Sequence, residues 1–222
     1  MKTIFATLLV SAAIMSACAD PTANKPKATT TAPSTANTAT PVAASQLPAS
    51  PADTKGTAIA VTPENSKIEF TGSKVTGKHD GGFKQFTGSI DLVGEKAETS
   101  TVNIDIDMKS LFTDTDGLTK HLMTADFFEV EKYPKATFVS TKIVPPIGGA
   151  GTYNVTGDFE IHGVKKSITF PATIRVRPEL ISVIAEFSIN RKDFGIVYAG
   201  KTDDLIRDDV LIRLELTPKR TK

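Results

Sequence analysis

Apolar and polar residues alternate with a period of two along most of the chain after residue 56. The clearest case is residues 102–108, where Val102, Ile104, Ile106 and Met108 are separated by polar side chains. Such alternation predicts antiparallel strands with one apolar and one polar face. The same pattern gives about eight strands in all, the further candidates being residues 57–62, 66–75, 83–92, about 136–144, 153–161, 168–176, 181–189 and 210–216.

Glycine and proline separate most of these segments, at Gly81-Gly82, Gly94, Pro145-Pro146, Gly148-Gly149 and Gly163. One stretch, residues 118–123, predicts a short helix with Asp116 as its N-cap. An eight-stranded antiparallel barrel with one short helix is the most economical all-β architecture, because closure removes exposed sheet edges. A two-sheet sandwich is the alternative.

The first residues have the features of a secretory signal peptide, residues 1–17. Lys2 precedes a twelve-residue apolar stretch that is too short to span a bilayer as a helix. The segment Met15-Ser16-Ala17-Cys18 resembles a bacterial lipobox, and Cys18 is the single cysteine of the chain. The resemblance implies cleavage before Cys18 and acylation of its thiol and amino group; the alternative is an ordinary signal with an incidental cysteine. Ala19 after it implies the outer membrane, facing the periplasm, of a Gram-negative host.

Residues 18–56 differ in composition from the rest. Ala, Thr, Pro and Ser make up 27 of the 38 residues from 19 to 56, and none is aromatic. Such a segment buries too little apolar surface to offset the entropy of ordering. We expect a disordered tether that reaches about 30–40 Å and leaves the orientation of the domain free. Residues 57–222 are expected to form one β-barrel domain.

Composition excludes several classes of function. The formal net charge of the 222-residue chain is +1, which argues against nucleic-acid binding through a basic surface. The chain has no phosphate-binding loop, no nucleophile elbow and no cysteine-based zinc motif. Its three histidines, His79, His121 and His162, lie in separate segments. We therefore expect a binding protein that is not an enzyme and that holds no metal or other cofactor.

Three segments together resemble the YceI-like family, often described as polyisoprenoid-binding periplasmic proteins. They are HLMTADFFEVEKYPKATF at residues 121–138, GDFEIHGVKK at 157–166 and INRKDFGI at 189–196. The resemblance spans roughly residues 57–218. It implies a lipocalin-like eight-stranded barrel whose apolar lumen holds a long isoprenoid or a similar lipid, with no catalytic residues. Together with the lipobox-like segment, it predicts a membrane-tethered carrier. Many relatives carry an Arg-Asp pair where this chain has Leu118-Thr119, so the head-group preference is open.

The site expected from pattern and resemblance has two parts. The lipid-binding lumen would be lined by Phe70, Ile104, Ile106, Met108, Leu122, Phe127, Phe128, Phe159, Phe170, Ile174, Phe187 and Ile189. The head group would meet residues at the barrel mouth, namely His121, Asn190, Arg191, Lys165 and Lys166. Asn190 and Arg191 have a second interpretation, in which they tie a strand end by hydrogen bonds.

Two other functions stay open at this stage. A packed structural or stress-protective barrel would bind a protein partner, and its Phe-rich faces would be core. An enzyme would act on a prenyl lipid inside the barrel. Ligand chain length, the open end of the barrel and the oligomeric state are also open.

Overall fold

A computed structural model of the chain describes residues 20–34, 56–148, 151–202 and 204–220. The expected signal peptide, Cys18 and most of the expected tether lie outside these residues. The strands are β1 (Thr29–Thr31), β2 (Thr57–Val61), β3 (Ser66–Lys74), β4 (Gly77–Phe83), β5 (Phe86–Val93), β6 (Lys96–Asp107), β7 (Leu111–Thr113), β8 (Lys135–Val144), β9 (Thr152–Ile161), β10 (Val164–Val176), β11 (Ile181–Asn190), β12 (Gly200–Lys201), β13 (Asp204–Leu205) and β14 (Asp209–Leu216).

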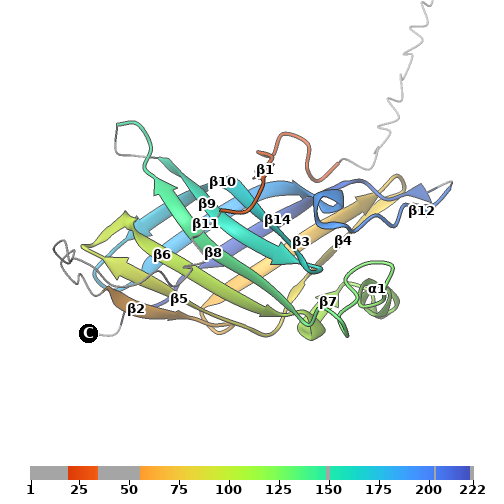
Figure 1. Cartoon of the computed structure of the whole chain (residues 1–222), viewed down its shortest axis with the longest axis horizontal. Helices are drawn as coiled ribbons and strands as arrows, with labels where there is room; N and C mark the ends of the chain where they lie inside the picture. The colour runs from red at the N-terminus through yellow and green to blue at the C-terminus, as the bar shows by residue number, and fades with distance from the viewer. Residues whose placement is uncertain (1–19, 35–55, 149–150, 203, 221–222) are drawn as a thin grey trace, which may run out of the picture.

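One strongly curled antiparallel sheet dominates the molecule (Figure 1). Its order is β2-β5-β6-β8-β9-β10-β11-β14-β3-β4-β7, and β1 adds to β10 as a twelfth strand. β12 and β13 form a separate two-stranded ribbon. The expected all-β, lipocalin-like fold is confirmed. The alternative, a two-sheet sandwich, is wrong, because one sheet contains all the long strands.

The expected closed barrel of eight strands is corrected to a half-barrel with more strands. Among the described residues no ladder joins the edge strands β2 and β7. The sequence pattern missed β4, because Gly81-Gly82 was taken for a turn. Both glycines are needed for close packing inside this strand: a Cβ at Gly81 would lie 2.5 Å from the Phe70 ring.

The turn expected at Gly163 is present. His162 (φ 54°) and Gly163 (φ 70°) are both left-handed and join β9 to β10. Two left-handed residues make the two-residue hairpin turn that matches the twist of paired strands.

The expected short helix is α1 (Asp116–Leu122). Its N-cap is Thr115, so Asp116 lies in the first turn and the expected capping role is wrong. A carboxylate in the first turn still stabilises the helix, because the N-terminal amides carry partial positive charge. Two short 3-10 helices, η1 (Met108–Ser110) and η2 (Arg191–Phe194), follow β6 and β11.

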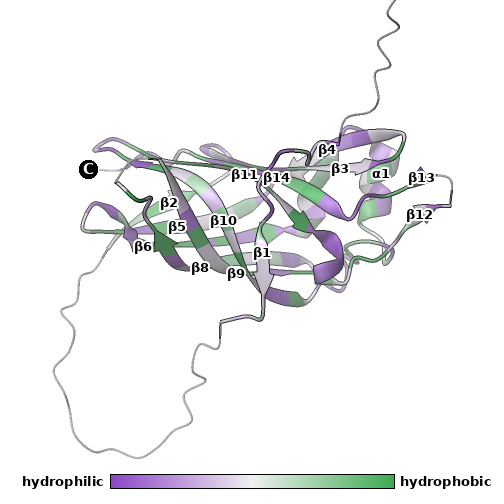
Figure 2. Cartoon of the chain, turned by 90° about the horizontal axis from the view of Figure 1, so that it is seen from above, coloured by the Kyte–Doolittle hydropathy of each residue, from purple (hydrophilic) through white to green (hydrophobic). Residues whose placement is uncertain are grey.

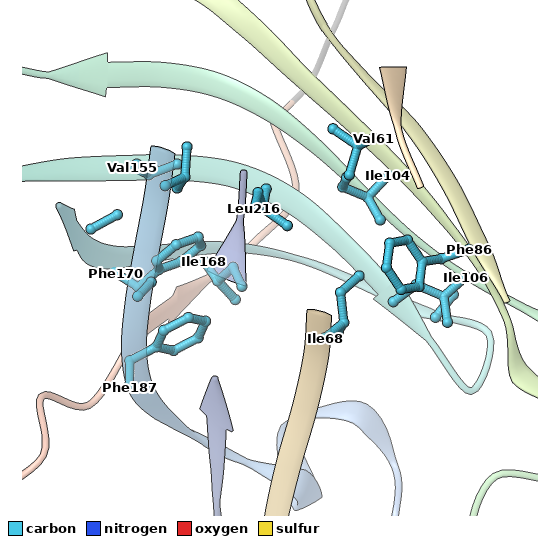
Figure 3. Packing of buried hydrophobic residues seen from close by; sticks show 14 of the residues in the cluster. Val61, Ile68, Phe86, Ile104, Ile106, Val155, Ile168, Phe170, Phe187 and Leu216 are labelled. Atoms are coloured by element: carbon cyan, nitrogen blue, oxygen red, sulfur yellow. The ribbon is translucent and has the colours of Figure 1, made fainter. Parts of the chain in front are cut away.

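The concave side of the sheet carries the core. Figure 2 shows hydrophobic and hydrophilic positions interleaved along the strands. In β11 the burial alternates, with Val183 and Ala185 buried and Ile184 exposed between them. Figure 3 shows the buried side chains converging from opposite walls, with Phe170 and Phe187 facing Ile104 and Ile106 across the interior.

Part of the expected tether is ordered, so that expectation is wrong for residues 20–34. Among the described residues β10 pairs with β11 only over residues 173–176 and 181–184. Beyond this pairing, the first half of β10 and the second half of β11 diverge, and residues 26–31 lie between them. Thr29–Thr31 pair with β10, while the Ala28 amide donates to the Ser188 carbonyl of β11. We call residues 20–34 the strap.

The alternation of apolar and polar residues does not indicate the strap, because the strap is held to the sheet by backbone hydrogen bonds and by one small apolar residue. Ala28 is only 6% exposed and joins the main core cluster. Salt bridges hold the rest, from Lys25 to Glu186 (2.6 Å) and from Lys27 to Asp209 (2.6 Å). A composition rich in Ala, Thr, Pro and Ser therefore does not prevent order where a sheet offers unpaired backbone groups.

Candidate functional site

The concave side of the sheet encloses an apolar cavity of about 340 Å³. Its wall comes from nearly every long strand, so no single element builds it. Inward positions are spaced by two residues in each strand, as in Ile104 and Ile106 of β6 or Phe187 and Ile189 of β11. The period-two pattern of the sequence thus places apolar side chains from nearly every long strand on one continuous inner surface.

Aromatic rings give the cavity wall much of its shape. Phe170 and Phe187 stack with their centroids 4.1 Å apart, and Phe138 lies 5.8 Å from Phe170. Phe159 meets Phe194 edge to face at 5.3 Å. These ring–ring contacts hold the aromatic side chains against one another in the cavity wall.

Most of the expected lumen residues share this cavity. Those that line it are Phe70, Ile104, Ile106, Leu122, Phe127, Phe128, Phe159, Phe170, Ile174, Phe187 and Ile189. Met108 does not line the cavity: it begins η1, is 1% exposed and packs in the core. The alternation that placed Met108 on the inner face ends at Asp107, where the strand gives way to the 3-10 helix. Contact of these residues with a lipid stays a prediction.

A smaller apolar cluster forms one end of the cavity, where α1 packs. Phe70, Leu111, Leu122, Phe127 and Ile196 are its buried members. Leu118 is among the partly buried residues packed against it and also lines the cavity. This side chain adds to the apolar character of this end of the lumen.

His121 lies on the solvent side of this cluster. Its Nε2 is 2.9 Å from Asp126 Oδ2, and its ring meets Phe127 and Tyr198 edge-on, at 5.1 and 5.3 Å between centroids. The imidazole therefore closes the cluster from outside. It does not line the cavity.

Arg191 is the most buried of the expected head-group residues, at 5% exposed, and it also lines the cavity. Its Nη1 donates to the Ile196 carbonyl (2.7 Å) and its Nε to the Arg207 carbonyl (3.1 Å). It also pairs with Asp208 at 3.3 Å. Burial lowers the pKa of this guanidinium. The side chain thus clamps the loop after η2 onto the sheet.

The other expected head-group residues lie outside the cavity wall. Asn190 caps η2, its Oδ1 accepting from the Lys192 amide at 2.9 Å. Lys165 pairs with Glu160 across the β9–β10 hairpin at 3.3 Å. Lys166 is half-buried on the same hairpin. The structure does not bring these residues together at one point.

The sequence reasoning missed four polar residues of the wall, namely Glu69, Ser73, Lys74 and His79. Lys74 bonds to Asp204, and this bond holds the pKa of Asp204 below its usual value. His79 Nδ1 is 2.9 Å from Asp114 Oδ1. Partial burial opposes a lowered pKa at Asp114, but the His79 bond and charge outweigh it. Only the continuation of the β3 alternation to residue 74 could have indicated Lys74.

The cationic wall residues Lys74 and Arg191 each already face a carboxylate. An anionic head group would have to compete with Asp204 for Lys74 and with Asp208 for Arg191. Among the described residues no group of three or more His, Cys, Asp or Glu side chains is placed to hold a metal ion. Across the same part of the chain, no helix combines the length and apolar character needed to cross a bilayer.

A strongly curled antiparallel sheet around an apolar lumen defines a lipocalin-like class of β-protein. Within this class, the model of the YceI-like domain matches residues 60–217, and the chain belongs to the YceI-like family. A UPF0312 protein of Pseudomonas putida (strain W619) is 36% identical over 138 residues, covering 60% of this chain and 71% of the relative. A UPF0312 protein of Pseudomonas syringae pv. syringae (strain B728a) is 34% identical over 136 residues, covering 59% and 70%.

Solved structures show the same fold. BcnA of Burkholderia cenocepacia matches with a TM-score of 0.61 and 26% identity, covering 71% of this chain and 98% of that one. The YCEI protein of Campylobacter jejuni matches with a TM-score of 0.57 and 27% identity, covering 64% and 85%. A polyisoprenoid binding domain from Saccharophagus degradans matches in fold with a TM-score of 0.60 and 19% identity, covering 75% and 100%. The strap lies outside the matched residues 60–217.

Proposed function

We propose that this protein binds and shields a long-chain isoprenoid or a similar lipid in its lumen, without catalysing a reaction. The observation that carries the proposal is the continuous apolar cavity inside the sheet. Membership of the YceI-like family supports it, as does the polyisoprenoid binding named for the Saccharophagus degradans domain of the same fold.

Apolar burial supplies the affinity in this proposal. At about 0.8 kcal/mol per methylene moved out of water, a dozen buried carbons are enough for tight binding. A lipid that starts in a bilayer gains little, because the bilayer is already apolar. The protein would therefore exchange and shield lipids. A cavity of about 340 Å³ is near the lower end for small-molecule sites, so we expect a long chain to be only partly enclosed.

Membrane tethering through acylated Cys18 is also part of the proposal. It rests on the lipobox-like segment Met15-Ser16-Ala17-Cys18, with Ala19 favouring the outer membrane and the periplasm. Two or more acyl chains give stable anchoring where a single chain does not. An anchored carrier has its lipid source within reach.

The test is to purify residues 20–222 without detergent, extract the protein with organic solvent and analyse the extract by mass spectrometry. Val183→Trp fills the lumen, since Val183 lines the cavity. Ile184→Trp is the matched control, because its neighbour Ile184 is 47% exposed on the outer face. We expect a stoichiometric isoprenoid from the wild type and the control, and its loss from Val183→Trp. Unfolding curves check that both variants fold.

An empty extract, with no uptake of added prenyl lipids, would refute lipid binding and favour a packed barrel that binds a protein partner. Conversion of an added prenyl lipid by the protein would favour an enzyme instead.

A further inference from the structure

Three exposed apolar side chains lie in segments that meet, through backbone bonds, at the end of the half-barrel where β3 turns into β4 and where β12 and β13 lie. They are Val75 (59% exposed), Val197 (64%) and Leu205 (50%). The Val75 amide donates to the Leu205 carbonyl at 3.2 Å, which joins the β3–β4 turn to the ribbon. Figure 1 shows β12 at the extreme tip of this end. We call these three residues the mouth surface.

The cavity reaches the mouth surface. Each of its three residues is the chain neighbour of a residue that lines the cavity: Val75 follows Lys74, Val197 follows Ile196, and Leu205 precedes Ile206. Since Lys74, Ile196 and Ile206 line the cavity, the cavity extends to the segments that carry the mouth surface.

The strap brings the start of the mature chain to the same end. Asp20 pairs with Arg207 at 3.2 Å, and Arg207 follows the cavity-lining Ile206. Cys18 is two residues before Asp20 in the sequence. A membrane anchor at Cys18 would therefore be joined to this end of the sheet by a short link, and not by a long free tether.

The strap is held firmly enough to transmit this placement. Lys25 and Lys27 each bond a carboxylate of the sheet at 2.6 Å, and Ala28 is buried. Backbone bonds on both sides fix residues 26–31 between β10 and β11. Residues 25–31 cannot leave the sheet without breaking these contacts.

Charge at this end does not oppose contact with lipid head groups. Lys74 pairs with Asp204, and Arg207 pairs with Asp20. Paired charges of both signs bring little net field to a bilayer surface, and apolar side chains can enter the interface between them.

We propose that the mouth surface docks into the interfacial region of the bilayer to which Cys18 is anchored, so that a lipid passes between membrane and lumen without crossing water. The docking rests on the proposed lipid anchor and gives the proposed carrier its route of exchange. Val75, Val197 and Leu205 make the contact, and the strap sets the orientation.

The experiment uses the full mature lipoprotein, purified from membranes and reconstituted into vesicles of phosphatidylethanolamine and phosphatidylglycerol. Acylated Cys18 leaves no free thiol, so single cysteines can be labelled with bimane. Val197→Cys reports on the mouth surface. Ile147→Cys, at a position that is 105% exposed in the loop after β8, is the matched control. Quenching by lipids with a nitroxide near the head group measures contact with the bilayer.

We expect strong quenching and a blue-shifted emission from the label at residue 197, and neither from the label at 147. Releasing the strap with Lys25→Glu and Lys27→Glu should abolish the difference, because both charges then repel Glu186 and Asp209. Lys132→Glu is the control, since Lys132 is paired with Glu129 at an exposed site outside the strap.

Equal or absent quenching at 197 and 147 would overturn the docking, and so would a mature chain whose mass shows no acyl groups on Cys18. Retained preference for 197 after strap release would overturn the role of the strap. The extraction experiment does not depend on docking, on acylation of Cys18 or on the role of the strap, because it uses unacylated protein. Docking without bound lipid would refute the carrier function alone, and bound lipid without docking would refute this inference alone.

Discussion

Replacing Arg191 by Ala tests whether this residue clamps the fold or binds a head group. The side chain is 5% exposed, and its two shortest bonds, at 2.7 and 3.1 Å, go to the carbonyls of Ile196 and Arg207. Bonds from a charged donor contribute about 1.5–3 kcal/mol each. The longer contacts, to Ile206 and Asp208 at 3.5 and 3.3 Å, add little. We expect Arg191→Ala to lower the free energy of unfolding by at least about 3 kcal/mol, because two bonds from a charged donor are lost and the buried bond to the Ile196 carbonyl leaves that acceptor without its partner.

Lys192→Ala is the matched control for Arg191. Lys192 also pairs with Asp208, at 2.9 Å, but its side chain is 48% exposed. Exposed pairs contribute at most about 1 kcal/mol. Urea unfolding of ligand-free residues 20–222 measures both variants, and Arg191→Lys should restore only part of the loss, because one ammonium cannot reproduce the guanidinium fork. Equal stability of Arg191→Ala and Lys192→Ala would refute the clamp. Loss of lipid affinity without loss of stability would make Arg191 a head-group residue.

Three further predictions concern packing, pH and a buried hydroxyl. Gly157→Ala should lower the free energy of unfolding by about 1–3 kcal/mol, because its Cβ would lie 2.4 Å from the Phe138 ring; an unchanged melting temperature would contradict this. The bond from Lys25 lowers the folded-state pKa of Glu186, so this pair stabilises the strap above about pH 4.5 and loses its effect as the pH falls through the lower folded value. The protection factors of the amides of residues 27–31, corrected for the intrinsic pH dependence of hydrogen exchange, should therefore fall in acid, and Glu186→Gln should remove that fall. Ser73 Oγ is buried with no hydrogen-bond partner among the described residues, so Ser73→Ala should raise the free energy of unfolding by up to about 1 kcal/mol; a fall in the urea midpoint would show a missed partner.

The inward residues of the long strands could be predicted from the sequence, because each long strand buries one face. In β6, Ile104 and Ile106 are buried while Asp105 between them is exposed. The same rule failed at Met108, where the period-two pattern runs on but the backbone turns into η1. Periodicity reports which residues are apolar, and it does not report where the backbone stops being extended.

The strap and β4 could not be predicted, for a related reason. Both are strands whose position depends on backbone pairing and close approach, which leave little trace in side-chain hydropathy. Gly81 has no side chain and so leaves room for the Phe70 ring, and Thr29–Thr31 pair with β10 through their backbone amides and carbonyls. Among the head-group candidates, Arg191 lines the cavity, and its bonds to the Ile196 and Arg207 carbonyls depend on a loop whose path no local pattern specifies.

The strap also imposes an order on folding. Lys25 and its partner Glu186 are separated by 161 residues, so the strap, which is made early, waits for a strand that is made late before it can pair. Contacts so distant in sequence form slowly, because a long loop must close before they are made. Until then the diverging parts of β10 and β11 present unpaired backbone groups, which another chain could bind. Were the chain anchored through Cys18, as proposed, before its strap docks, it would fold with that edge open beside the membrane.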